Sequence, residues 1–136
     1  MMKEFTIKDM SALLYEKLSK IKDFEDKQTE TTLDTSQEKI TTFPCRLINP
    51  PLEFIEKTQN AIPIRKKFQT KVEHIAISQA DVIEMANNTD LELRKIHFVK
   101  TLSESIMYDE KLQKYKQSNT YEVRYNMIFN TFEFIK

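Results

Sequence analysis

The absence of glycine is the feature that most restricts how this chain can fold. None of its 136 residues is glycine, whereas an average protein of this length contains roughly nine or ten. Tight hairpin turns and helix C-termini commonly use glycine because it adopts positive φ without steric cost. In this chain such positions must use asparagine or aspartate, or be replaced by longer loops. The candidate substitutes are Asn49, Asn60, Asn87, Asn88, Asn119 and Asn130.

The same absence excludes several classes of function. The P-loop, the dinucleotide-binding fingerprint and the nucleophile elbow all require glycine at fixed positions, where the backbone approaches a phosphate or turns sharply. We therefore expect no nucleotide cofactor and no catalysis built on these motifs.

The charge and the cysteine content further limit the kind of protein that this chain can be. Lys plus Arg and Asp plus Glu each number 21, so the formal net charge is zero. Proteins that bind nucleic acid by counterion release carry an excess of Lys and Arg, and this chain has no such excess. A net charge of zero also removes electrostatic repulsion between copies, which favours association. Cys45 is the single cysteine, and no apolar run approaches the ~20 residues of a membrane span. We expect a chain without a signal peptide, made and kept in a reducing cytosol.

The first half of the chain predicts a helix, a polar stretch and a strand. Apolar residues at helical spacing predict an amphipathic helix over residues 6–22. Residues 23–39 are predicted to be a polar loop, or alternatively an arm that becomes ordered on a neighbouring subunit. Alternation over 40–48 predicts a strand, which Pro44 should confine to a sheet edge or a bulge. Residues 50–63 are predicted to form an insertion loop.

The second half predicts a long strand, a helix and a hairpin. Residues 64–77 alternate as a strand, and Ser78 begins a helix over 78–96. Two strands follow at 98–109 and 114–129, and 131–136 is either a short strand or a tail. The later strand has the strongest pattern, because its large side chains share one parity: Tyr115, Tyr121, Val123, Tyr125, Met127 and Phe129.

The order helix, strand, strand, helix, strand, strand predicts an α+β fold. We expect a mainly antiparallel four-stranded sheet with both helices packed on one face, all within a single domain spanning residues 1–136.

The residues able to carry chemistry are few and scattered. His74 and His97 have no acid or thiol at a metal-ligand spacing, so no metal site is predicted. His74 is interpreted as a hydrogen-bonded strand residue, with a catalytic base as the alternative. Cys45 is interpreted as a small apolar filler, because a nucleophile would need a base beside it. We expect no enzymatic activity and no cofactor.

One basic cluster and one group of tyrosines remain. Residues 65–67 form the only basic triplet; it could meet phosphate or an acidic partner, although an isolated triplet is more typical of a solvated strand end. Tyr121 and Tyr125 are expected in the core. Tyr115, nearer the turn, could be exposed at an interface.

Two stretches of the chain carry a family resemblance: Phe68 to Ser78 followed by Gln79 to Arg94, and Tyr108 to Tyr125. They resemble the strand-to-helix core and the closing hairpin of the tail-terminator (tail-completion) proteins of tailed phages and phage-tail-like contractile particles. The resemblance covers most of the chain and consists of patterning and short phrases.

The resemblance implies a ring, usually of six subunits, that caps the tail tube, ends tube and sheath polymerisation and joins the tail to the head or collar. Its implied partners are copies of itself, the tail tube protein and sheath, head or collar proteins, with DNA as a contact only in the lumen and no membrane. It implies assembly in the cytoplasm of a bacterial host. The family supplies no catalytic, cofactor or metal residues. The lack of glycine and the polar 23–39 stretch depart from its pattern, so loop contacts are not transferred.

A closed ring requires heterologous contacts, which edge strands and extended arms can provide. The candidate interface residues lie around Cys45, in the 52–63 segment, in the basic triplet and at the second hairpin: Phe43, Cys45, Phe54, Ile55, Arg65, Lys66, Lys67, Asp109, Glu110, Lys111 and Tyr115. The alternatives are another head–tail connector or tube-forming component, and a small nucleic-acid-binding or small-molecule-binding module.

Overall fold

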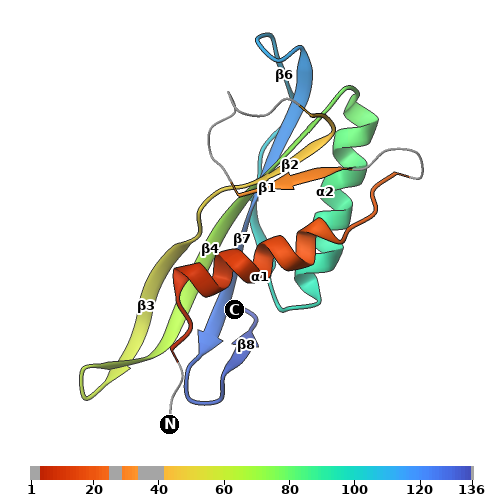
Figure 1. The fold of residues 1–136 in the computed structure, drawn as a ribbon. Coiled ribbons are helices and arrows are strands. Elements are labelled where there is room, and N and C mark those ends of the chain that lie inside the picture. The colour runs from red at the N-terminus through yellow and green to blue at the C-terminus, as the bar shows by residue number, and fades with distance from the viewer. Residues whose placement is uncertain (1–3, 25–28, 34–41, 136) are drawn as a thin grey trace.

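Two long antiparallel strands form the spine of the molecule. The computed structural model describes residues 4–24, 29–33 and 42–135. Strand β4 (Ile62–Ala76) pairs with β7 (Lys114–Asn126) in a continuous register from Arg65↔Asn126 to Ala76↔Tyr115. Both strands run the length of the molecule (Figure 1).

Shorter strands cover the outer edges of this spine in segments. On the β4 side, β2 (Cys45–Ile48) pairs with one end of β4 and β3 (Leu52–Gln59) with the other, and β1 (Glu30–Thr32) adds to β2 in parallel. On the β7 side lie β6 (Met107–Asp109), β5 (Val99–Ser103) and β8 (Thr131–Glu133). The result is an open sheet whose two ends are hairpins, one of β3 with β4 and one of β6 with β7.

Both helices pack on the same face of this sheet (Figure 1). Helix α1 (Ile7–Ser19) begins at Thr6 in a capping box with Asp9, and α2 (Gln79–Arg94) begins at Ser78, whose side chain accepts a hydrogen bond from the Asp81 backbone. The main core joins α1, the end of α2 and the spine: Met10, Leu14, Leu18, Ile48, Phe68, Val72, Leu93, Phe98, Tyr121, Val123, Tyr125 and Met127. The α+β class and the positions of both helices are therefore confirmed.

The prediction of a four-stranded antiparallel sheet was wrong, because the described residues form eight strands in a mixed sheet. The predicted insertion loop contains β3, which has exposed apolar residues on both faces. Polar and apolar residues alternate in a strand when one of its faces is buried against a core. Strand β3 covers no core, so its sequence does not show this alternation. The predicted strand at 98–109 is divided into β5 and β6 by residues 104–106.

The position predicted for Pro44 was also wrong. Strand β2 lies between β1 and β4, not at an edge. The sheet tolerates the proline because it precedes β2, where no ladder hydrogen bond needs its missing N–H. Its carbonyl accepts a hydrogen bond from the Glu30 backbone N–H at 3.1 Å. Of the polar stretch predicted at 23–39, residues 25–28 and 34–39 lie outside the described residues.

Positive φ angles show how the chain turns without glycine. Asn60 (53°) and Ala61 (63°) form the β3–β4 turn, and Asn130 (53°) lies in the turn before β8. Gln113 (55°) occupies the turn before β7, and His97 (71°) follows α2. Two of the predicted asparagines thus serve as glycine substitutes.

Candidate functional site

A buried ion pair lies beneath α2. Arg46 on β2 is fully buried, and its guanidinium donates to both carboxylate oxygens of Asp23 at 3.0 and 2.8 Å. Arg46 also donates to the Thr89 hydroxyl (2.9 Å) and the Met85 carbonyl (3.0 Å). Burial alone would raise the pKa of Asp23, but hydrogen bonds from Arg46 and Asn88, with the charge of Arg46, hold it below its usual value. The pair is therefore ionised and well satisfied.

The hydrogen bonds of His74 define its tautomer. Its Nδ1 lies 3.1 Å from Oε1 of Gln117, which can only accept, and its Nε2 lies 2.8 Å from the Thr89 hydroxyl. Burial and the charge of Arg46 lower the pKa of His74 to about 3. A neutral ring must carry its proton on Nδ1, so Nε2 accepts the Thr89 hydroxyl proton. The Met85 carbonyl remains satisfied by Arg46.

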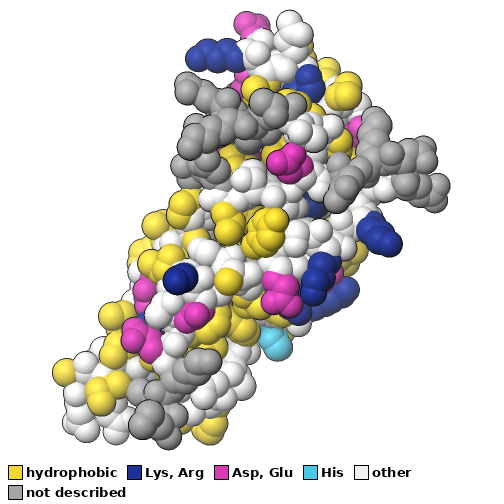
Figure 2. All heavy atoms as spheres, in the orientation of Figure 1, with side chains coloured by type: hydrophobic (Ala, Val, Ile, Leu, Met, Phe, Trp, Pro, Cys, Tyr) yellow, Lys and Arg dark blue, Asp and Glu magenta, His cyan; other side chains and the backbone are white. Residues whose placement is uncertain are grey.

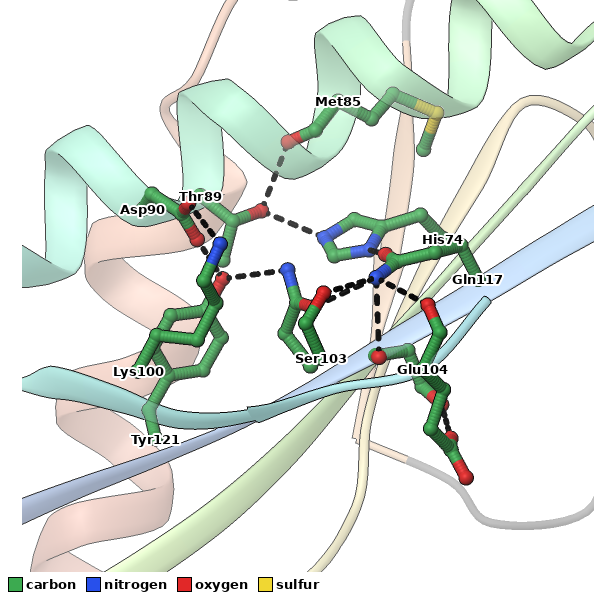
Figure 3. Close-up of polar contacts among 11 residues, drawn as sticks. His74, Met85, Thr89, Asp90, Lys100, Ser103, Glu104, Gln117 and Tyr121 are labelled. Atoms are coloured by element: carbon green, nitrogen blue, oxygen red, sulfur yellow. Dashed lines mark hydrogen bonds and ion pairs between the residues drawn. The ribbon is translucent and has the colours of Figure 1, made fainter. Parts of the chain in front are cut away.

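The hydrogen bonds continue in the same donor-to-acceptor direction along β7 (Figure 3). The Gln117 side-chain amide donates to Oδ1 of Asn119 at 2.6 Å, and Nδ2 of Asn119 lies 3.2 Å from the Tyr121 hydroxyl. That hydroxyl donates to Asp90, whose other oxygen pairs with Lys100 Nζ at 2.9 Å. A chain of hydrogen bonds therefore runs from the Arg46 guanidinium to the Asp90 carboxylate, and each group accepts from the one before it and donates to the one after it. In such an arrangement each hydrogen bond polarises the next.

This buried network fits a structural role better than a catalytic one. Both ring nitrogens of His74 are occupied, and the ring is neutral at physiological pH. The prediction that His74 is a hydrogen-bonded strand residue is confirmed. Sequence reasoning missed Arg46 and Asp23, although a charged residue inside the apolar run Cys45–Ile48 was a signal that a buried partner exists.

Cys45 is also enclosed. Its side chain is fully buried, and burial, with the charges of Glu30 and Glu73, raises its pKa to about 12 against the opposing charge of Arg46. The thiol therefore stays protonated, and it has no exposed surface. Among the described residues, no three His, Cys, Asp or Glu side chains cluster as a metal site would require.

The basic triplet is divided between the two faces of the sheet. Lys66 is 2% exposed and its ammonium lies within 3.3 Å of carboxylates of Glu4 and Glu53. Burial alone would lower the pKa of Lys66, but these two carboxylates raise it above its usual value. Arg65 and Lys67 lie on the helix-free face and form ion pairs of their own. The triplet is therefore not a patch of free positive charge.

The two ends of the spine expose apolar side chains. At one end the arm, which we define as residues 52–64, exposes Leu52, Phe54, Ile55 and Ile62, each at least 43% accessible. At the other end the distal hairpin, residues 107–116, exposes Met107 (66%) and Tyr108 (51%). Figure 2 shows hydrophobic side chains gathered along the β3 side of the molecule down to the arm. Such exposure is typical of surfaces that meet a partner.

The other predicted interface residues lie at or near the distal hairpin. Asp109 accepts hydrogen bonds from the Lys111 and Leu112 backbones and so shapes the turn. Glu110 and Lys111 are exposed at its tip. Tyr115 is half-buried against Tyr108, with ring centroids 5.2 Å apart.

Phe43 precedes β2 and is half-buried. The Lys114 ammonium lies 5.1 Å from the centre of its ring. The predicted interface residues therefore divide into a group on the arm (Phe54 and Ile55), a group around the distal hairpin, the ion-paired Arg65 and Lys67 on β4, and the enclosed Cys45 and Lys66.

No protein-family model matches this chain, and no curated protein shows significant similarity to it. Within the described part of the chain, neither helix has the length and apolar character needed to cross a bilayer.

Proposed function

We propose that this protein is a non-enzymatic assembly subunit that forms a ring of the tail-terminator type. Such a ring would cap a tail tube, end its polymerisation and present a joining surface to a head or collar. The proposed partners are further copies of the chain and the tube subunit. DNA contact through residues 65–67 is not part of the proposal, because their side chains are paired with carboxylates.

The observation that carries the proposal is the exposure of apolar side chains at both ends of the β4–β7 spine. The arm and the distal hairpin project in opposite directions (Figure 1). They differ in sequence and shape, so a contact between one copy's arm and another surface of its neighbour would be heterologous, the kind that closes rings.

The arm is held rigidly enough to serve as an interface. Glu56 on β3 reaches across β4 to Arg124 on β7, forming two hydrogen bonds of 2.7 and 3.2 Å. The Lys67 ammonium lies 4.9 Å from the centre of the Phe54 ring. A preordered ribbon loses little conformational entropy on binding, which favours association.

The test is the assembly state of the purified chain. We expect sedimentation velocity and negative-stain microscopy to show a closed ring, or a concentration-dependent oligomer that binds tube subunits. A protein that stays strictly monomeric and ignores tube subunits would overturn the proposal.

Replacing Phe54 and Ile55 together by serine should weaken assembly by at least about tenfold in dissociation constant, because it removes exposed apolar contact area. Leu102→Ser is the matched control, since Leu102 is similarly exposed (57%) but lies on β5, away from both ends. Circular dichroism should show unchanged helix content in both variants. Equal assembly of the two variants would show that the arm is not an interface.

A further inference from the structure

An open groove of about 540 Å³ lies between α1, the end of β7 and β8. Its lining combines aromatic and aliphatic side chains with three carboxylates: Glu4, Phe5, Asp9, Ala12, Leu13, Glu16, Tyr125, Asn130 and Phe132. No lysine or arginine is among these residues, but Glu4 is paired with Lys66 and Asp9 caps α1, so Glu16 is the carboxylate that a new cation would meet. The groove therefore suits a ligand segment that carries apolar side chains and a cation.

The walls of this groove are firmly fixed. Phe5 stacks on Tyr125 with ring centroids 4.7 Å apart and meets Phe132 edge-on at 5.5 Å. The Phe5 carbonyl accepts a hydrogen bond from the buried Lys66 ammonium at 3.2 Å. The groove is thus a preformed feature, which lowers the entropic cost of binding.

The solvent face of α2 has the complementary character. Ala80, Ile83, Asn87, Leu91 and Arg94 recur at helical spacing along the exposed side of α2, away from its buried residues, and the exposed Glu84 lies beside them. We call the five residues that recur at this spacing the outer stripe. Ile83 is 49% and Leu91 58% exposed, so this solvent face carries two large aliphatic side chains. Arg94 is exposed at its end and forms no ion pair with any described residue.

We propose that the acidic groove of one copy receives the outer stripe of a second copy. Leu91 and Ile83 would lie against the aromatic floor, and Arg94 would face the carboxylate rim, in the manner of an amphipathic helix in a groove. Glu16 is the rim carboxylate best placed to change partner, because its ion pair with Lys20 is exposed and 3.5 Å long. Exposed pairs of this kind contribute little to stability. This inference rests on the self-assembly proposed above and specifies one of its contacts.

Charge reversal at each side of the contact tests the proposal in the full-length chain. Arg94→Glu and Glu16→Lys should each raise the dissociation constant of assembly by at least roughly tenfold, because like charges would then meet. The double variant should assemble as the wild type does. An equimolar mixture of the two single variants should also assemble, because each can bind the other through one native and one swapped contact.

Lys22→Glu is the control for Arg94→Glu, since it makes the same change of charge at an exposed residue outside both surfaces. Circular dichroism at the same concentrations establishes that each variant is folded. Wild-type-like assembly of both single variants would overturn the inference while leaving the proposed function intact. Loss of assembly that neither the double variant nor the mixture restores would also overturn it. A monomeric wild type would instead refute the proposed function itself.

Discussion

At the scale of single residues, the most consequential feature is the neutral state of His74. Its imidazole is fully buried between β4 and α2 and faces the guanidinium of Arg46, which is itself paired with Asp23. Protonating the ring would place a second cation in this enclosure and would turn Nε2 from acceptor to donor. The folded state therefore resists protonation that the unfolded chain accepts freely.

This difference predicts an acid-sensitive fold. The pKa of His74 is about 3 in the folded state against 6.5 ordinarily, so between these values the unfolded chain binds more protons and stability falls as pH falls. At up to 1.36 kcal/mol per pH unit, the free energy of unfolding should drop by about 2 kcal/mol from pH 7 to pH 5. Urea titrations at the two pH values measure this drop.

Variants of the two histidines test whether His74 causes this pH dependence. His74→Gln should abolish most of the difference between pH 7 and pH 5, even though it lowers stability at both. His97→Gln should retain it, because His97 lies outside the buried network. The lowered pKa of Asp23 makes stability depend on pH mainly below the ordinary aspartate pKa of 3.8. Asp23 therefore does not contribute to the change between pH 7 and pH 5. Equal pH dependence in the wild type and in His74→Gln would refute the assignment.

At the scale of elements, the turns show that the absence of glycine costs stability, because other residues must adopt positive φ. The β3–β4 turn holds both Asn60 and Ala61 at positive φ. Asparagine tolerates this conformation because its short polar side chain bonds locally, whereas alanine places its Cβ too near the backbone. The arm is therefore built on a turn whose second residue is strained.

Ala61→Gly should stabilise the protein by about 1 kcal/mol, since it removes strain of roughly 1–2 kcal/mol at the cost of some unfolded-state entropy. Thermal or urea unfolding measures the change. The matched control is Ala80→Gly in α2, where φ is helical and glycine should destabilise by roughly 0.5–1 kcal/mol. Destabilisation by Ala61→Gly would contradict the left-handed geometry of this turn.

At the scale of the whole molecule, charge is balanced locally as well as in total. The helix-free face of the sheet pairs Arg65 with Glu133, Lys67 with Glu122 and Arg124 with Glu56. A surface neutralised in this way attracts no polyanion over a distance, whereas the apolar ends of the spine remain available for contact.

We therefore predict very weak binding to duplex DNA. At physiological salt the dissociation constant should exceed about 10⁻⁴ M, and its dependence on salt should be close to flat, because few counterions can be released. Replacing Glu122 and Glu133 by glutamine should free Lys67 and Arg65, strengthening binding and steepening the salt dependence by up to roughly two ions. Tight, steeply salt-dependent binding by the wild type would favour a nucleic-acid module over an assembly subunit.

Both helices and the two spine strands were predictable from local sequence patterns. The capping residues Thr6 and Ser78 and the apolar stripes behind them specify α1 and α2, while alternation specifies β4 and β7. These signals are local, since each arises when one face of a regular element is buried. The helices and strands that carry such signals can be predicted without knowing which other element covers the buried face.

The contacts between residues distant in the chain were not predictable from the sequence, because they depend on how the elements pack. Asp23 meets Arg46 and Thr89 meets His74 because the fold brings distant segments together, and no spacing in the chain encodes those contacts. Strand β3 was hidden for the opposite reason, because both of its faces are exposed and it leaves no burial pattern. The groove beside α1 and the stripe on α2 likewise exist only once the elements are packed, since a surface is defined by what surrounds it.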